Sequence, residues 1–291
     1  FHALCARLLR RYAEAADLPG LRPDYTIYDT SDQTAAMKRV LTNLGLTTAN
    51  WPPRSVLAAI SNAKNELLDA AAFEANANDF YTKQVAKIYS AYAAELRKAG
   101  AIDFDDLLLY TARMLETRPE IRAELVSRWR YVMIDEYQDT NRAQFRIASL
   151  LAPASQDNPP NICVVGDPDQ AIYGWRGADI TNILEFETHY PGAEVIMLGE
   201  NFRSTAPILA TADQLIKHNV KRKDKPLFTS RPGGEPITLV HCRDERHEAE
   251  LVADWFRALH DEHGVSWKDM AVFYRTNALS RVMEDALRTN Q

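Results

Sequence analysis

The chain has 291 residues, 46% of them hydrophobic, and its 34 basic and 40 acidic residues give a net charge of -6. This length favours one large domain or two modest ones, with enough apolar residues for a sizeable core. The negative balance argues against a protein that coats nucleic acid by bulk charge. The sequence contains no run of eighteen apolar residues, so it predicts neither a membrane-spanning helix nor a membrane partner.

The three cysteines, Cys5, Cys163 and Cys242, are far apart and form no zinc-type spacing. Neither a disulfide framework nor a zinc site is therefore expected, and a reducing cytoplasm is the simplest location. The N-terminal segment FHALCARLLRRY has arginines scattered along an amphipathic pattern, which indicates a cut helix and not a signal peptide.

After a first helix, the chain is predicted to be almost wholly helical from Tyr25 to about Leu115. Apolar spacing predicts helices over 1–15 and 80–96, and further helices beginning at Ser31 as an N-cap and at Pro52-Pro53. Asp103 is expected to cap a helix over 104–114. Capping and helix-start charge explain Asp103, Asp105 and Asp106 more simply than a metal site does.

From about residue 116, short apolar runs alternate with helical patterns. Strands are predicted at 131–134, 161–165, 194–198, 237–242 and 269–274, and helices at 119–129, 141–151, 179–189, 207–218 and 246–263. This alternation predicts an α/β fold with a mainly parallel sheet, interrupted by an inserted helical subdomain.

Two of the predicted strands end in polar residues. The first ends in Asp135 and Glu136, and the second is followed by Asp167 and Gln170. An acid at the end of a buried strand can hold Mg²⁺, and a second acid can orient or deprotonate water for attack on a phosphate. Adjacent acids alone would be better explained as a solvated loop. Their combination with Gln138, Asp139 and the second strand with its Gly-Asp-x-x-Gln segment makes a phosphate-transfer site the stronger interpretation.

These segments resemble a known family. DEYQDTNRAQ (135–144) and VVGDPDQAIYGWRGADI (164–180) closely resemble motifs II and III of the UvrD/PcrA/Rep family of superfamily 1 DNA helicases. NFRST (201–205) resembles motif IV, AVFYRTNALSRVMEDAL (271–287) resembles motif IVa, and FHALCARLLR (1–10) resembles motif Ib. The resemblance covers essentially the whole chain.

The resemblance implies domain boundaries. Residues 1–22 and 116–203 would belong to a RecA-like, P-loop NTPase-type domain, 1A. Residues 23–115 would form the inserted all-helical subdomain 1B, and residues 204–291 the first part of a second RecA-like domain, 2A.

The resemblance also implies an ATP site. Asp135 would coordinate Mg²⁺, Glu136 would activate the attacking water, and Gln170 would sense the terminal phosphate. Arg203 would reach the γ-phosphate as an arginine finger does. Phe202 stands where the family usually has Tyr, so it would keep the stacking on adenine and lose the hydroxyl.

The DNA site implied by the resemblance is spread over the chain. Tyr173 and Trp175 would stack on single-stranded bases. Their spacing of two would put both rings on one side of an extended segment. Arg176 would support either the DNA groove or the nucleotide. The remaining contacts would come from Phe1 and His2 in the first domain and from Arg275 and Asn277 in the second.

The predicted function is thus an ATP-dependent 3'-5' DNA helicase or translocase that acts on single-stranded DNA and single-/double-strand junctions. It would serve DNA repair or replication restart, with repair or replication proteins as partners. The sequence lacks a GxxxxGK[ST] phosphate loop. We therefore expect an internal piece of a longer enzyme, and no ATP turnover by this piece alone.

Two alternatives stay open at this point. One is a catalytically inactive module that binds nucleic acid or a partner, which the missing phosphate loop motivates and the intact acids oppose. The other is the helicase subunit of a helicase–nuclease. A basic cluster at 217–225 is equally well explained as a solvated helix end or as a nucleic-acid contact.

Overall fold

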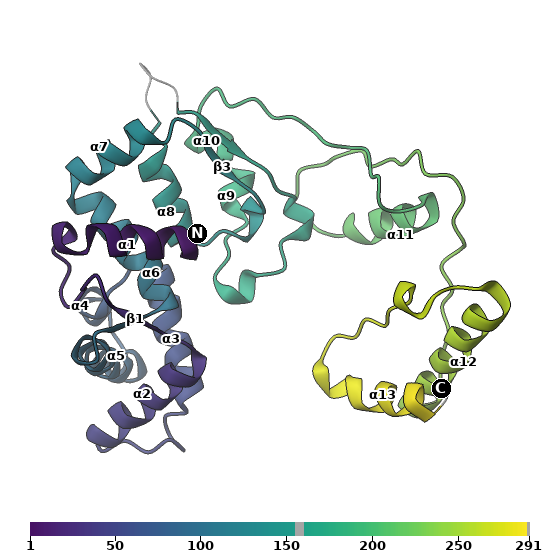
Figure 1. Cartoon of the computed structure of the whole chain (residues 1–291), viewed down its shortest axis with the longest axis horizontal. Helices are drawn as coiled ribbons and strands as arrows, with labels where there is room; N and C mark the ends of the chain where they lie inside the picture. Colours follow the sequence, from purple (N-terminus) through teal and green to yellow (C-terminus); the bar gives the residue numbers. More distant parts are fainter. Residues whose placement is uncertain (155–159, 290–291) are drawn as a thin grey trace. The chain divides into compact units, whose positions relative to one another are not determined.

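The chain forms two compact units in the computed structural model, which describes residues 1–154 and 160–289. One unit comprises residues 1–199 and 215–226, and the other comprises residues 200–214 and 227–291. Figure 1 shows the elements of each unit, coloured along the sequence. Among the described residues, the structure has no helix that combines the length and the apolar character needed to cross a membrane.

The first unit is mainly helical. Its helices are α1 (His2–Ala16), α2 (Thr30–Asn43), α3 (Pro53–Asn65), α4 (Ala70–Ala75), α5 (Phe80–Lys98), α6 (Phe104–Thr117), α7 (Pro119–Arg128), α8 (Arg142–Leu151), α9 (Thr181–Leu184) and α10 (Phe186–His189). The predictions for α1, α5, α7 and α8 are confirmed. The single helix predicted over 179–189 is wrong, since α9 and α10 are separate short turns.

Acidic side chains start several of these helices. Asp103 caps α6 as predicted, in a capping box with Asp106. The prediction of Ser31 as the cap of α2 is wrong. Asp29 holds that position, and its Oδ1 accepts a hydrogen bond of 2.9 Å from the backbone N–H of Asp32. Asp29 and Asp32 form a reciprocal capping box, which places the N-cap two residues before Ser31.

Two apolar clusters form the core. The first joins α1, α6, α7 and α8 through buried side chains such as Leu9, Met114 and Ile147. The second joins α2, α3 and α5 through side chains such as Met37 and Tyr89. The helical part of the first unit therefore has a well-buried interior.

A buried ion-pair network joins α3 to the start of α6. Nζ of Lys64 lies 2.7 Å from Oδ2 of Asp103 and 2.7 Å from Oδ1 of Asp106, and the Lys64 side chain is only 2% exposed. Burial alone would lower the pKa of Lys64, but the two carboxylates raise it well above its ordinary value. Burial and the negative charge of Asp103 raise the pKa of Asp106 to about 7.

Two small parallel sheets accompany the helices. Strand β1 (Thr26–Tyr28) pairs with β2 (Ala101–Asp103), and β3 (Val132–Ile134) pairs with β4 (Ile162–Val164). The β1–β2 pair contradicts the prediction of an almost wholly helical segment up to residue 115. Each of these strands has three residues, which is too short to produce a recognisable alternation.

Strands β3 and β4 are less buried than the sequence predicts. The side chain of Met133 is 77% exposed, and Cys163 is exposed as well. The expectation of buried strands is therefore wrong for these residues. Within residues 1–154 and 160–289, these strands pair only with each other, so no further strand extends their sheet.

The other unit contains most of α11 (Ala206–Ile216), together with α12 (Glu245–His263) and α13 (Ser280–Thr289). The predicted helices over 207–218 and 246–263 are confirmed. The strands predicted at 194–198, 237–242 and 269–274 are not formed among the described residues. Leu198, Leu239 and Phe273 are 78%, 97% and 93% exposed, and these segments have no strand to pair with.

Candidate functional site

The end of β3 presents two acidic residues. Asp135 is exposed, and its Oδ1 accepts a hydrogen bond of 2.9 Å from the backbone N–H of Glu136. Glu136 has φ 51° and ψ 43°, in the left-handed region that residues other than glycine rarely adopt. Such strain is typical of functional sites, because the surrounding structure must hold it in place.

Asp135 is suited to Mg²⁺. This ion prefers one or two carboxylates and takes its other oxygens from water and substrate phosphates. A single exposed carboxylate at a strand end fits that requirement. Over residues 1–154 and 160–289, the structure has no group of three or more His, Cys, Asp or Glu side chains that could hold a metal by themselves.

Gln138 connects the two strand ends. Its Nε2 donates a hydrogen bond of 2.7 Å to Oε2 of Glu136, and its Oε1 accepts one of 3.0 Å from the backbone N–H of Asp167. A Cβ added at Gly166 would lie 2.5 Å from Oε1 of Gln138, so this approach requires glycine. The sequence gives no sign of this role, because it depends on the pairing of β3 with β4.

Asp139 is a further acid that interacts electrostatically with Glu136. Burial and then the negative charge of Glu136 raise the pKa of Asp139 above its ordinary value. The Glu136 carboxylate thus accepts a hydrogen bond from Gln138 and interacts electrostatically with Asp139.

The segment after β4 carries Gln170. Pro168–Gln170 forms one 3-10 turn, in which the Asp167 carboxylate accepts hydrogen bonds from the backbone N–H of Asp169 at 2.9 Å and from Nε2 of Gln170 at 2.8 Å. Gln170 itself is exposed. The structure thus brings Gln170 to the same sheet edge as Asp135 and Glu136, as the sequence predicts for neighbouring strand ends.

The aromatic residues follow on a second turn. Tyr173 and Trp175 are 38% and 73% exposed, with ring centroids 6.4 Å apart. The guanidinium carbon of Arg176 lies 4.6 Å from the Trp175 centroid and 5.4 Å from the Tyr173 centroid. The expectation of an extended segment is wrong, because Gly174–Arg176 is a 3-10 turn closed by Gly177 at φ 83°. The turn nevertheless keeps the two rings together.

The N-terminal residues differ in their surroundings. Phe1 is half-buried and packs against the first core cluster, whereas His2 is exposed. The His2 ring meets the edge of Phe104 at a centroid distance of 6.2 Å. Phe104 is 46% exposed at the start of α6. The sequence does not indicate that the Phe104 ring is exposed beside His2, because a Phe that follows an N-cap is expected to be the first core residue of a helix.

The remaining predicted site residues lie in the other unit and are exposed: Phe202, Arg203, Arg275 and Asn277. Oδ1 of Asn201 accepts hydrogen bonds from the backbone N–H groups of Arg203 at 3.0 Å and Ser204 at 2.7 Å. Nη1 of Arg231 donates a bond of 2.7 Å to the Arg203 carbonyl. These contacts fix the backbone of the turn that carries Phe202 and Arg203.

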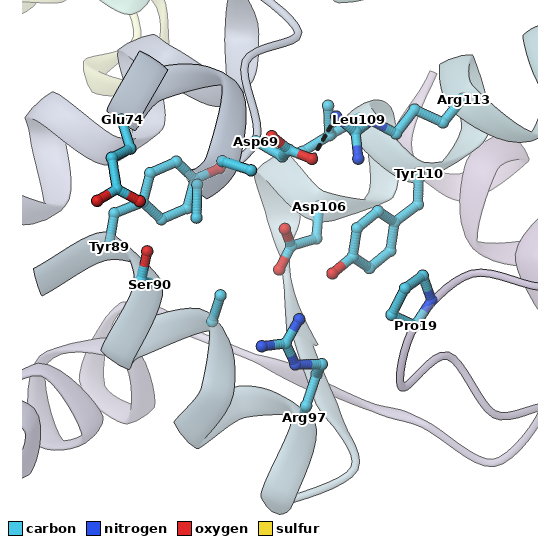
Figure 2. A pocket seen from close by; sticks show the side chains of 13 residues that line it. Pro19, Asp69, Glu74, Tyr89, Ser90, Arg97, Asp106, Leu109, Tyr110 and Arg113 are labelled. Carbon is cyan, nitrogen blue, oxygen red and sulfur yellow. Dashed lines mark ion pairs between the residues drawn. The ribbon is translucent and has the colours of Figure 1, made fainter. Parts of the chain in front are cut away.

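A cavity of about 280 Å³ lies elsewhere, among α4, α5 and α6. Figure 2 shows Asp106, Tyr110 and Arg97 around it, together with the ion pair of 2.6 Å between Asp69 and Arg113. None of the predicted site residues lines this cavity. At the strand-end site, Asp135, Glu136 and Gln170 are exposed.

Comparisons with known proteins agree with this arrangement. Residues 1–191 match the UvrD/REP helicase N-terminal domain, and residues 196–291 match the UvrD-like helicase C-terminal domain. The chain is 44% identical over 285 residues to the ATP-dependent DNA helicase PcrA of Staphylococcus aureus, covering 98% of this chain and 38% of that protein. It is 43% identical over 287 residues to PcrA of Leuconostoc citreum, covering 99% of this chain and 37% of that protein. Both matches to PcrA and both domain matches lead to the same assignment: the chain belongs to the UvrD/PcrA/Rep-type family of superfamily 1 helicases.

Proposed function

We propose that the chain is the central part of an ATP-dependent DNA helicase that moves 3'-5' on single-stranded DNA. The observation that carries this proposal is the link between the ends of β3 and β4. Through Gln138, Glu136 is joined to the segment that carries Gln170, Tyr173 and Trp175. A nucleotide-dependent motor requires such a connection between its hydrolytic groups and its DNA-binding groups.

In this proposal, Asp135 holds Mg²⁺, and Glu136 orients and deprotonates the attacking water. Bound Mg²⁺ would supply charge neutralisation on the phosphate oxygens. Gln170 responds to the terminal phosphate, Arg203 neutralises charge that develops on it, and Phe202 stacks on adenine. The ATP and Mg²⁺ requirements of the family support these roles.

The DNA site is proposed to consist of the exposed rings of Tyr173 and Trp175, with Arg176 beside them. Their exposure suits stacking on bases of any sequence. Phe1, His2, Arg275 and Asn277 would add contacts. Because Phe1 is half-buried, it would support His2 more than touch DNA. Single-/double-strand junctions and repair or replication proteins are the proposed partners.

The proposed domain assignment follows the same family. Residues 1–22 and 116–203 form domain 1A, residues 23–115 the helical insertion 1B, and residues 204–291 the first part of 2A. The chain spans 38% of the PcrA length that it matches. We therefore propose that it functions within a longer enzyme located in the cytoplasm.

The decisive experiment measures ATP hydrolysis by the longer protein with and without single-stranded DNA. The expected result is strong stimulation by DNA, which Glu136→Gln abolishes. The matched control is Glu14→Gln, an exposed glutamate on α1, which should retain full activity. DNA binding without turnover in the unmodified protein would overturn the motor and leave an inactive binding module.

A further inference from the structure

The basic cluster after α11 is paired with acids of the segment that carries Gln170. Nη2 of Arg222 lies 3.1 Å from Oδ2 of Asp169. Lys225 forms an ion pair with Asp167, and its Nζ lies 3.6 Å from Oδ2 of Asp169. The cluster belongs to the first unit, within residues 215–226. These contacts make the cluster part of the candidate site.

The four side chains are largely shielded from water. Arg222 and Asp169 are 10% and 8% exposed, and Lys225 and Asp167 are 13% and 24% exposed. Ion pairs on an open surface contribute little to stability, but removing one partner of a shielded pair leaves an uncompensated charge. A solvated helix end, one of the two explanations of this cluster, does not have such burial.

The pair between Arg222 and Asp169 is made through one nitrogen and one oxygen. Nε of Arg222 and Oδ1 of Asp169 are buried and have no hydrogen-bond partner. The ion pair between Arg222 and Asp169 is thus monodentate and not bidentate. A lysine at position 222 could make the same contact, whereas an uncharged residue could not.

Asp167 contacts both the basic cluster and the residues of the candidate site. Its carboxylate accepts from Gln170 and from Lys225, and its backbone N–H donates to Gln138. Burial alone would raise the pKa of Asp167, but the hydrogen bonds from Lys225 and Gln170 lower it. The carboxylate that holds Gln170 therefore has Lys225 as its ion-pair partner.

We propose that Lys225 and Arg222 are positioning residues that fix the loop of residues 167–176 by pairing with Asp167 and Asp169. The loop carries Gln170, Tyr173 and Trp175, so the two cations control its geometry without touching ATP or DNA. The expected effect of the two cations on ATP turnover rests on the proposed helicase function, whereas their expected effect on the geometry of the loop does not.

The first test measures amide hydrogen exchange of residues 167–176 in the longer protein. Lys225→Met, which keeps the length of the apolar stem, is expected to speed exchange of these amides at least tenfold. Lys225→Arg restores the charge and should restore slow exchange. The control is Lys221→Met, an exposed lysine of the same cluster, which should have no effect. Unchanged exchange in Lys225→Met overturns the proposal.

The second test compares kcat with KM for single-stranded DNA in ATP hydrolysis. Positioning predicts a fall in kcat of about 10- to 100-fold for Lys225→Met and Arg222→Met, with KM for DNA unchanged and with recovery in Arg222→Lys. A direct DNA contact predicts instead that KM rises in Lys225→Met and Lys221→Met alike while kcat is retained, and this result overturns the proposal. If the unmodified protein hydrolyses no ATP, the proposed function fails, and hydrogen exchange alone decides the role of the cations.

Discussion

Gln138 donates a hydrogen bond of 2.7 Å from Nε2 to Oε2 of Glu136, and only 1% of the Gln138 residue is exposed. The proposed catalytic base is thus held by a buried amide. The other end of that amide accepts the backbone N–H of Asp167. Any change at Gln138 acts on both strand ends at once.

Gln138→Leu is expected to lower kcat for ATP about 10- to 100-fold, because the Glu136 carboxylate loses the group that orients it. The Asp167 N–H also loses its acceptor, which should cost about 1–3 kcal/mol of stability. Steady-state ATP hydrolysis by the longer protein at saturating DNA measures the first effect. Gln84→Leu on α5 is the control, and an unchanged kcat in Gln138→Leu would contradict the positioning of Glu136.

Lys64→Met is expected to destabilise the first unit by about 3–5 kcal/mol. It removes the cation that is ion-paired with the buried Asp103 and Asp106 and leaves buried negative charge without compensation. Urea unfolding followed by circular dichroism measures the change. Lys87→Met on the exposed side of α5 should stay within about 0.5 kcal/mol of the unmodified protein. Equal effects of the two substitutions would show that the buried pairs contribute no more than a surface lysine.

The raised pKa of Asp106 predicts a specific pH dependence. In the folded state its pKa is about 7, above the ordinary value of 3.8. Between pH 3.8 and pH 7 the folded state binds more protons than the unfolded state. The contribution of Asp106 to the free energy of unfolding is therefore full below pH 3.8 and is lost as the pH rises through 7. Asp106→Asn removes this dependence. Urea unfolding of both proteins from pH 4 to pH 8 should show their stability difference changing across this window, and a constant difference would refute the shift.

Trp175→Ala is expected to weaken binding of single-stranded DNA by about 1–3 kcal/mol, the contribution of one stacked base. Trp255, which is 54% exposed on α12, offers a matched control. Fluorescence anisotropy with a labelled oligonucleotide measures both variants. If Trp255→Ala weakens binding as much as Trp175→Ala, the ring at position 175 has no special role in DNA binding.

Local features of the fold could be predicted from the sequence. Asp103 caps α6 as expected, because an N-cap depends on residues within one helical turn. The convergence of Glu136 and Gln170 could also be anticipated, since neighbouring parallel strands end at one edge. The parallel pairing of β1 with β2 could not, because it joins segments about seventy residues apart through three residues each.

Non-local contacts explain the other failures. Lys64 has the sequence neighbourhood of an ordinary helical lysine, and its burial depends on the carboxylates of Asp103 in β2 and Asp106 in α6. Segments 237–242 and 269–274 have strand-like composition, but a strand exists only where a partner satisfies its backbone groups. Arg222 and Lys225 likewise could not be distinguished from their exposed neighbour Lys221 before their acidic partners were located.

The left-handed backbone at Glu136 has a consequence for protein engineering. A glutamate in that conformation costs about 1 kcal/mol or more relative to residues that tolerate it. Selection for thermal stability alone would favour Asn at this position, because Asn accepts the left-handed region more readily than most other side chains. The same replacement would remove the carboxylate of the proposed catalytic base, so we expect variants of the longer protein selected only for heat resistance to be enriched in inactive ones.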